Sequence, residues 1–423
     1  MKSGVHMKIS EIKPEVYEMA KRTQKKLGGR FEEIDIVAEH NTRKVMEAFQ
    51  NHRVSEACFA GTTGYGYDDL GRETLDKIYA DVFGTEAALV RIQFVNGTHA
   101  LTAAMFSLAE PGQKIVAVTG MPYDTLRTAI GISGDCFGSL KFYGIDYGQV
   151  DLAPDGGPDY DAIREAVREK NVAGVMIQRS RGYEDRRALS VREIAKIVDT
   201  VKKVNPDIHV MVDNCYGEFT ELEEPGNVGA DLTVGSLIKN PGGGIAPTGA
   251  YIAGTKELVE RAAMRLTTPG IGGECGSSLG NNRLLFQGLF MAPHVVAQAL
   301  KTACFCAGMM EELGIESSPG ALEPRSDIIQ MVKLASPGNM KRFCLGIQAG
   351  APVDSYVTPE PWAMPGYDCP VIMAAGAFIQ GSSIELSADG PFREPYTVYM
   401  QGGLTYESGK LGIMMAVSAI LEG

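Results

Sequence analysis

The sequence predicts an α/β protein, with a mostly parallel β-sheet in a large domain and a smaller C-terminal α+β domain. Short apolar runs alternate with amphipathic helical segments between Gly61 and about Gly254, and a more mixed pattern follows from about Met291. The chain has 423 residues, of which 44% are hydrophobic. This length exceeds what one hydrophobic core usually serves, so we expect more than one domain.

The first part of the chain is predicted to be helical. In segments 15–27 and 32–54, apolar residues recur at the spacing of an amphipathic helix, with charged residues between them. We therefore expect an N-terminal helical arm over residues 1–60.

The central segment, 61–290, is expected to be the large domain. Its apolar runs are short, which is typical of strands that helices cover on both faces of a parallel sheet. Helical segments 160–170 and 191–204 lie between such runs. The predicted strands are 87–94, 114–120, 172–178, 209–214, 232–236 and 248–254.

The last segment, 291–423, is expected to be the smaller α+β domain. A long helical stretch at 293–314 leads into short apolar runs between 332 and 389. A final helix is expected within 410–423.

Charge and composition argue against several classes of protein. The formal net charge of −12 opposes the phosphate neutralisation that drives nucleic-acid binding. No apolar run approaches the roughly 20 residues of a membrane-spanning helix, and the first residues lack the apolar core of a signal peptide. The eight cysteines include no CxxC pair. We therefore expect a cytoplasmic protein with reduced, mostly buried thiols and no metal site.

Two charged residues follow strands of the predicted sheet. Lys239 comes shortly after strand 232–236 and precedes the glycine-rich stretch NPGGGIAPTG, and Asp213 lies at the end of strand 209–214. In an open parallel sheet the carboxyl ends of the strands form the edge at which ligands bind. This context disfavours the alternatives, a solvated loop lysine and an ordinary turn aspartate.

Further residues at this edge suit a phosphate group and an aromatic ring. Gly97 and Thr98 open the helix predicted after strand 87–94, so their backbone N–H groups face an anion. Ser236 can add a hydroxyl, and Tyr123 follows strand 114–120. Taken singly, an Asn-Gly-Thr helix start is also a common cap, and a lone tyrosine more often packs in a core.

Together these residues match the needs of an enzyme that uses pyridoxal 5'-phosphate (PLP). Such an enzyme needs a lysine for the Schiff base, a carboxylate to keep the pyridine nitrogen protonated, an anion site for the phosphate, and an aromatic group for the ring. Lys239, Asp213, the helix start and Tyr123 supply the four in turn. The sequence therefore predicts PLP as the cofactor, attached to Lys239.

The order of these residues also carries a family resemblance. It resembles the Cys/Met-metabolism branch of the fold-type I PLP enzymes, which includes cystathionine γ-synthase, cystathionine β-lyase and methionine γ-lyase. Over nearly its full length the chain is similar to the methionine γ-lyase-like group described as aluminium-resistance or cystathionine β-lyase-like proteins. The strings that carry the similarity are GTTGYGYDDLGRETLDKIYADVFGTEAALV, VDNCYGEF, GSLIKNPGGGIAPTGAYIAG and ELSADGPFREPYTVYMQGGLTYESG.

This resemblance implies the fold-type I, PLP-dependent transferase-like architecture and a homotetramer built as a dimer of dimers. It also implies that Tyr65 reaches the cofactor of a neighbouring subunit. Tyr67, two residues on, is then expected to contact the substrate there.

Two departures from the family pattern concern anion binding. The family's arginine for the neighbour's cofactor phosphate is absent from segment 65–67, so Arg72 or a helix end is expected to substitute. The stretch QRSRGYEDRR stands where the family has a Pro-x-Asn-Pro segment, and it offers Arg179 and Arg181 as new anion contacts.

A third departure concerns the substrate carboxylate. The family's arginine in Arg-Leu-Ser is replaced by Glu385. We expect Arg393 to bind the carboxylate instead, because guanidinium gives two parallel hydrogen bonds and a turn at 388–391 could return it to the same pocket.

The predicted reaction is β- or γ-elimination at a carbon–sulfur bond of an amino acid, which is the expected small-molecule partner. Lys239, its pKa lowered by the site, is expected to remove the Cα proton, while Asp213 holds the pyridinium and Tyr123 assists departure of the thiol. Gamma-replacement, aldol cleavage and transamination use the same residues, and a non-catalytic scaffold is a further alternative. A dehydrogenase is disfavoured, because no GxGxxG motif follows an early strand.

Overall fold

A computed structural model describes residues 7–134, 137–364 and 369–422. By internal contacts the chain divides into two compact units: residues 41–291 form one, and residues 1–40 with 292–423 form the other. Residues of the predicted N-terminal arm thus contribute to both units. The division into 1–60, 61–290 and 291–423 stays a prediction, because compactness alone does not show which parts fold independently.

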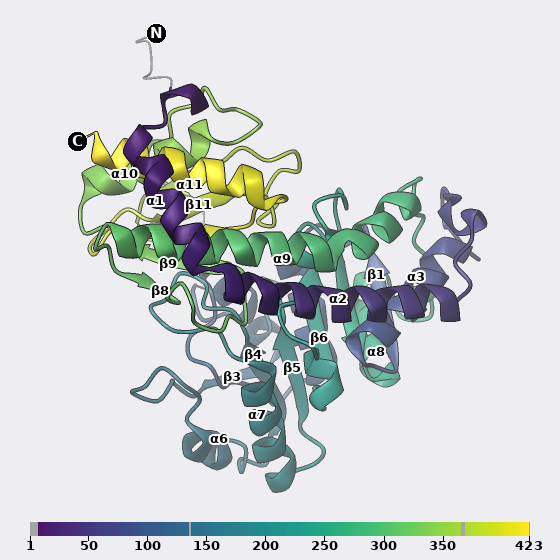
Figure 1. The fold of residues 1–423 in the computed structure, drawn as a ribbon. Helices are drawn as coiled ribbons and strands as arrows, with labels where there is room; N and C mark the ends of the chain where they lie inside the picture. The colour runs from purple at the N-terminus through teal and green to yellow at the C-terminus, as the bar shows by residue number, and fades with distance from the viewer. Residues whose placement is uncertain (1–6, 135–136, 365–368, 423) are drawn as a thin grey trace. The chain divides into compact units, whose positions relative to one another are not determined.

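The unit 41–291 is built on a seven-stranded sheet with strand order β1-β7-β6-β5-β4-β2-β3 (Figure 1). Strands β2 to β6 pair in parallel, whereas β7 is antiparallel to both of its neighbours. The predicted α/β class with a mostly parallel sheet is confirmed. The strands are β1 (Ala87–Arg91), β2 (Lys114–Ala117), β3 (Asp146–Gln149), β4 (Val172–Gln178), β5 (His209–Asp213), β6 (Leu232–Ser236) and β7 (Ala250–Gly254).

Strand β3 is absent from the sequence prediction. Its four residues, DYGQ, are polar or small and none is buried. It lies at the edge of the sheet with β2 as its one neighbour. An edge strand of this kind lacks the apolar pattern by which the other strands were predicted.

Side chains of the central strands alternate between two cores, one on each face of the sheet. In β5, Val210 and Val212 pack with α6 and α7, while Met211 packs on the other face with α4, α5 and α8. The helices of this unit are α3 (Leu70–Phe83), α4 (Gly97–Leu108), α5 (Asp124–Ile130), α6 (Tyr160–Ala166), α7 (Val191–Val204) and α8 (Lys256–Leu266). Short 3-10 helices are η2 (Glu56–Phe59), η3 (Lys141–Tyr143), η4 (Pro225–Val228), η5 (Asn240–Gly242) and η6 (Gly272–Glu274).

Two long helices, α2 (Gly28–Asn51) and α9 (Asn282–Glu312), have residues in both units. By length and composition α9 could cross a membrane, but 72% of its most apolar stretch is buried inside the protein. The apolar composition of α9 is therefore explained by its burial in the protein core.

The other unit contains a five-stranded antiparallel sheet of order β10-β11-β12-β9-β8. Helix α1 is joined to α9 by ion pairs from Arg22 to Glu312, at 2.7 Å, and from Lys26 to Glu311, at 2.5 Å. The elements are η1 (Ile9–Glu11), α1 (Pro14–Lys26), β8 (Ser317–Ser318), β9 (Ile329–Lys333), α10 (Pro337–Ala349), β10 (Val371–Ala375), β11 (Ser387–Pro391), β12 (Thr397–Gln401) and α11 (Tyr406–Leu421).

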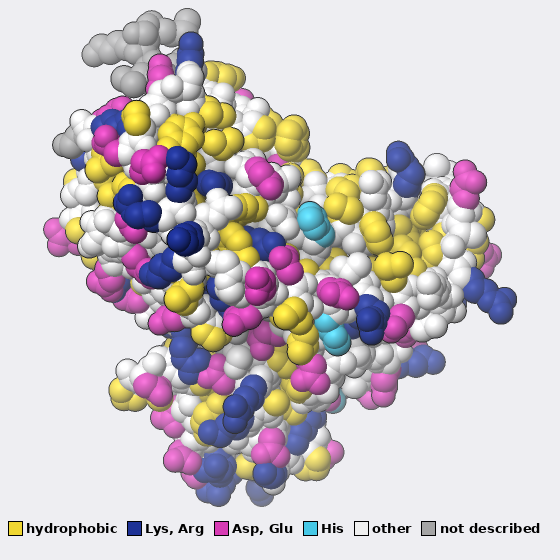
Figure 2. Space-filling model, in the orientation of Figure 1, with side chains coloured by type: hydrophobic (Ala, Val, Ile, Leu, Met, Phe, Trp, Pro, Cys, Tyr) yellow, Lys and Arg dark blue, Asp and Glu magenta, His cyan; other side chains and the backbone are white. Residues whose placement is uncertain are grey.

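The surface carries charges of both signs. On the face shown in Figure 2, Lys and Arg side chains lie interspersed with Asp and Glu. The cysteines that the structure describes are free thiols, and Cys58, Cys215, Cys304, Cys306 and Cys344 are buried. Within the described ranges, no group of three or more His, Cys, Asp or Glu side chains is arranged to hold a metal ion.

Candidate active site

Several of the predicted site residues lie at one edge of the seven-stranded sheet. Asp213 is the last residue of β5 and Ser236 the last of β6, and these two strands pair in parallel. Lys239 directly precedes η5. Because β7 is antiparallel to both β6 and β1, β1 also ends at this edge, where Gly97 opens α4.

The start of α4 lies against the end of β6 and against Tyr123. The Thr98 hydroxyl oxygen is 3.0 Å from the Tyr123 hydroxyl oxygen, and either group can donate. A Cβ on Gly97 would stand 3.4 Å from Ser236 Cβ and 3.8 Å from Cys215 Sγ. Glycine at position 97 thus leaves room between the N-terminus of a twelve-residue helix and a buried serine.

Electrostatic contacts connect Lys239 with the chain after β5. Its Nζ lies 4.1 Å from the centroid of the Tyr216 ring. Burial lowers the pKa of Lys239, but the charges of Cys215, Tyr216 and Asp213 act in the opposite direction and leave this pKa well above its usual value. The expected lowering is therefore wrong, because Lys239 shares this space with acidic groups.

The two other predicted catalytic side chains also have raised pKa values. Burial raises the pKa of Asp213, against the opposing effect of Lys239 and of the backbone N–H of Cys215, which donates to Oδ1 at 3.2 Å. Burial, reinforced by the charge of Asp213, raises the pKa of Tyr123. Tyr123 therefore keeps its proton at neutral pH, so it cannot accept a proton there.

The predicted anion contact through Arg179 is wrong. The Arg179 side chain is fully buried and donates to Asn214 Oδ1 at 2.7 Å and to Glu221 Oε1 at 2.8 Å. Its charge is thus already paired, and the guanidinium supports the segment that follows Asp213. Arg181 is buried as well.

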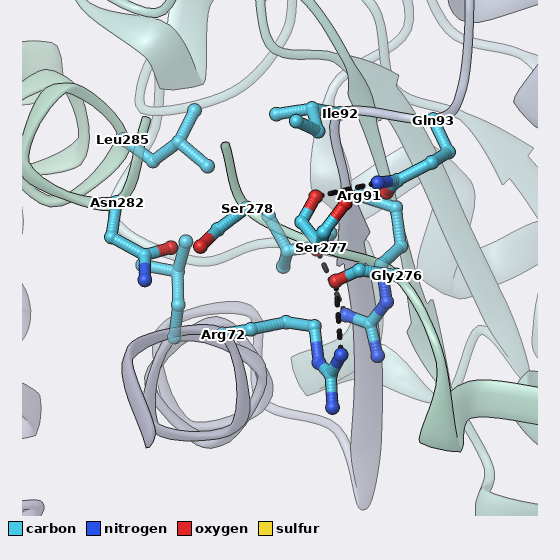
Figure 3. A pocket seen from close by; sticks show the side chains of 11 residues that line it. Arg72, Arg91, Ile92, Gln93, Gly276, Ser277, Ser278, Asn282 and Leu285 are labelled. Atoms are coloured by element: carbon cyan, nitrogen blue, oxygen red, sulfur yellow. Dashed lines mark hydrogen bonds between the residues drawn. The ribbon is translucent and has the colours of Figure 1, made fainter. Parts of the chain in front are cut away.

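Arg72 joins two loops of its own chain, and its expected contact with a neighbour's phosphate stays a prediction. Its guanidinium donates to the carbonyl oxygens of Gly66, Gly276 (2.9 Å) and Glu274 (3.1 Å), which ties two loops together. The bond to Gly276 is drawn in Figure 3. The small pocket in Figure 3 lies beside these contacts. Its lining residues do not include Lys239, Asp213 or Tyr123; they are Arg72, Leu75, Val90, Arg91, Ile92, Gln93, Gly276, Ser277, Ser278, Asn282 and Leu285.

Tyr65 and Tyr67 project from one of these two loops. Their rings stack with centroids 5.7 Å apart, and the residues are 73% and 55% exposed. Within the unit 41–291 they thus present an aromatic surface to the outside.

The turn at 388–391, on which the prediction for Arg393 rests, is a strand in the structure. Residues 388–391 belong to strand β11, so the expected turn is absent there, and Arg393 lies exposed in the hairpin between β11 and β12. A five-residue strand spans about 13 Å between its end Cα atoms, so β11 holds Glu385 and Arg393 apart. Glu385 itself is buried and accepts hydrogen bonds from the backbone N–H groups of Phe378 (2.8 Å) and Ile379 (3.0 Å).

Some residues near the site were not predicted from the sequence to have a function. Tyr216 contacts Lys239, and the buried Glu218 accepts a hydrogen bond from Tyr251 at 3.1 Å. A signal for both exists in VDNCYGEF, where an aromatic and an acidic residue flank a glycine directly after a buried strand.

The architecture and the comparisons with known proteins define the class of protein. The fold is that of the fold-type I PLP-dependent enzymes. The PLP-dependent protein YhfS from Escherichia coli superimposes with a TM-score of 0.60 at 17% sequence identity, covering 89% of this chain and 94% of that one, a likeness of fold alone. The sequence profile of methionine gamma-lyase matches residues 16–421, and the chain belongs to this family. The family resemblance is therefore confirmed.

Similar proteins cover nearly the whole chain. The uncharacterised protein YnbB of Bacillus subtilis strain 168 is 49% identical over 94% of each chain. A solved structure described as a carbon–sulfur lyase involved in aluminium resistance, from Clostridium novyi NT, is 52% identical with a TM-score of 0.93, covering 96% of each chain. L-methionine gamma-lyase from Pseudomonas putida is 25% identical over 49% of this chain and 48% of that protein. Family and relatives together indicate a PLP-dependent carbon–sulfur lyase type.

Proposed function

We propose that the protein is a PLP-dependent enzyme that cleaves a carbon–sulfur bond of a sulfur-containing amino acid by β- or γ-elimination. The supporting observation is the gathering of Lys239, Asp213, Tyr123 and the start of α4 at the carboxyl edge of the sheet. The description of the C. novyi relative as a carbon–sulfur lyase agrees with this reaction.

The residues at this edge fit PLP. Lys239 would hold the cofactor covalently through Nζ, and Asp213 would face the pyridine nitrogen. The backbone N–H groups of Gly97 and Thr98, with the Ser236 hydroxyl, would hold the phosphate at the positive end of α4. The space left by the missing Cβ of Gly97 next to Ser236 supports this assignment. Tyr65 from a neighbouring subunit would complete the site.

When bound, PLP supplies an electron sink for the electron pair left at Cα of an amino acid. Once the substrate amine has displaced it from the cofactor, the Lys239 amine would take the Cα proton at Nζ and become an ammonium group. Asp213 would remain ionised opposite the protonated ring nitrogen. Tyr123, which holds its proton, would donate it to the departing sulfur.

Substrate binding, assembly and location are part of the same proposal. Arg393 would bind the substrate carboxylate and Tyr67 would line the substrate site. The exposure of Tyr65 and Tyr67 supports a homotetramer, a dimer of dimers, in which they reach a neighbour's site. The net charge of −12 supports a cytoplasmic protein with a small-molecule partner rather than nucleic acid or a membrane.

Product analysis of the purified holoenzyme tests this function. The panel is cystathionine, methionine, homocysteine, cysteine and threonine. Elimination predicts a thiol, ammonia and a 2-oxo acid from at least one of the sulfur-containing substrates. Glycine and acetaldehyde from threonine would indicate aldol cleavage, retention of the amino group on the cofactor would indicate transamination, and thiol exchange without ammonia would indicate γ-replacement. No product from any substrate would favour the non-catalytic scaffold.

A further inference from the structure

Tyr216 combines a contact with Lys239 and an unusual backbone conformation. The Lys239 Nζ lies 4.1 Å from the centroid of its ring. Its φ of 74° lies in the left-handed region, where a side chain with a Cβ is unfavourable and an aromatic one is rare. A backbone held in such a conformation is a common feature of functional sites, because the surrounding structure must enforce it.

Arg179 and the next glycine enforce this conformation. A Cβ on Gly217 would stand within 2.7 Å of three Arg179 side-chain atoms, so the chain can pass there only as glycine. The Gly217 N–H donates to the Asn214 carbonyl at 2.9 Å, and Arg179 fixes Asn214 and Glu221 on either side. The segment 214–221 is thus held by a buried arginine.

The same segment is fixed relative to Lys239. The side-chain amide of Asn240, directly after Lys239, donates to the carbonyl oxygen of Glu218 at 3.0 Å. Both residues are fully buried, which protects this bond from competition by water. The distance between the Tyr216 ring and the Lys239 side chain is therefore set by the backbone on both sides.

We propose that Tyr216 is a positioning residue for Lys239: the face of the Tyr216 ring binds the Nζ ammonium group by a cation–π contact and holds it in place. This inference rests on the proposed function for its role in catalysis. A ring face attracts a cation far more than a neutral amine. When Lys239 has taken a proton from Cα, the Tyr216 ring would therefore hold the ammonium group in place until Nζ releases that proton to solvent.

Other groups also face the Lys239 amine. Asp213 comes from β5, Cys215 from the segment after it, and Tyr123 from the start of α5. The buried Glu218 acts on the same charge from the segment that carries Tyr216. Because these groups remain, removal of the Tyr216 ring should lower the basicity of Lys239 in part only.

The test measures Lys239 in full-length protein without cofactor. The rate of reductive methylation of Lys239 is followed by peptide mass spectrometry between about pH 9 and pH 12, because the pKa of Lys239 lies above its usual value. Tyr216→Leu removes the ring face, and Tyr216→Phe is the matched control that keeps it. Tyr216→Gly removes the ring and suits the left-handed backbone, so it guards against a folding defect in the Leu variant.

We expect the Leu and Gly variants to titrate about 0.5 pH unit or more below wild type, which is roughly a threefold change in the equilibrium constant. The Phe variant keeps the ring face and loses only the hydroxyl of Tyr216, whose charge also acts on Lys239, so its shift should be clearly smaller than that of the Leu and Gly variants. A change in access alone would scale the rate at every pH and leave the midpoint in place. Unchanged midpoints in both the Leu and Gly variants, or an equal shift in the Phe variant, would overturn the proposal. Since neither cofactor nor substrate takes part, a failed product assay would leave this result standing.

Discussion

At the level of single residues, two buried carboxyl groups five positions apart have different partners. Asp213 faces Lys239, which opposes the rise that burial causes in its pKa. Glu218 lies farther inside, where burial raises its pKa to about 8 and the charge of Glu224 acts in the same direction. The missing Cβ of Gly235 makes room for it, since a Cβ there would stand 2.2 Å from Glu218 Oε1. Asp213 is therefore suited to stay charged beside a cation, and Glu218 to stay neutral.

Asp213→Asn should still bind PLP but lose Cα deprotonation by a factor of about 100 or more. A neutral amide cannot keep the ring nitrogen protonated while charge builds up at Cα. The measurement is exchange of the substrate Cα hydrogen with deuterium from solvent. Exchange at the wild-type rate would show that Asp213 is not the partner of the ring.

Glu218→Gln should change how stability depends on pH. The folded-state pKa of about 8 lies above the ordinary value of 4.5, so the folded state holds the extra proton between these values. Stability from this group is present below pH 4.5 and is lost as pH rises toward 8. The free energy of unfolding is measured with denaturant at pH 6 and at pH 9. Between these two pH values the wild type should lose more of this free energy than the glutamine variant does, by on the order of 2 kcal/mol. Parallel losses would mean that Glu218 ionises normally.

At the level of elements, the loops that carry Tyr65 and the residues 274–282 are held by one carboxylate. Asp69 caps α3 at the Arg72 N–H (2.9 Å) and accepts from the side chains of Thr62, Ser278 and Asn282. These hydrogen bonds outweigh burial and lower its pKa, to about 2. The loop that presents Tyr65 and Tyr67 is therefore fixed by contacts within its own chain.

Hybrid oligomers test whether Tyr65 serves a neighbour. Lys239→Ala chains and Tyr65→Phe chains, each inactive alone, should regain part of the activity when mixed. A site that combines Lys239 of one chain with Tyr65 of the other would contain both native residues. No gain in activity, once subunit exchange is verified by mass spectrometry, would place Tyr65 in its own subunit's site or outside any site.

The β11–β12 hairpin carries Arg393, whose proposed role rests on chemistry rather than on proximity to Glu385. Arg393→Lys should lower kcat/KM for an amino acid, with a loss of roughly 2 kcal/mol in transition-state binding, because a lysine cannot form the two parallel hydrogen bonds. The loss should be far smaller for the matching amine that lacks the carboxylate. Equal losses on both substrates, or none on either, would place the carboxylate elsewhere.

At the level of the whole molecule, the sequence predicted those parts that depend on local pattern. Apolar runs identified the buried strands, and the rule that ligands bind at the carboxyl edge selected Asp213, Ser236 and Lys239. The sequence could not predict that β7 runs antiparallel to its neighbours, because the pattern of apolar residues does not fix the direction of a strand. The pairing of Arg179 and the backbone of Tyr216 depend on residues far along the chain or on enforced strain, which composition and spacing do not reveal.

The most direct test of the account is the identity of the lysine that carries the cofactor. The holoenzyme is reduced with borohydride, digested, and its PLP-labelled peptide is sequenced by mass spectrometry. We predict a single labelled peptide, with the label on Lys239. A label on another lysine, such as Lys256 or Lys333, or the absence of bound cofactor after reconstitution with PLP, would contradict the central claim.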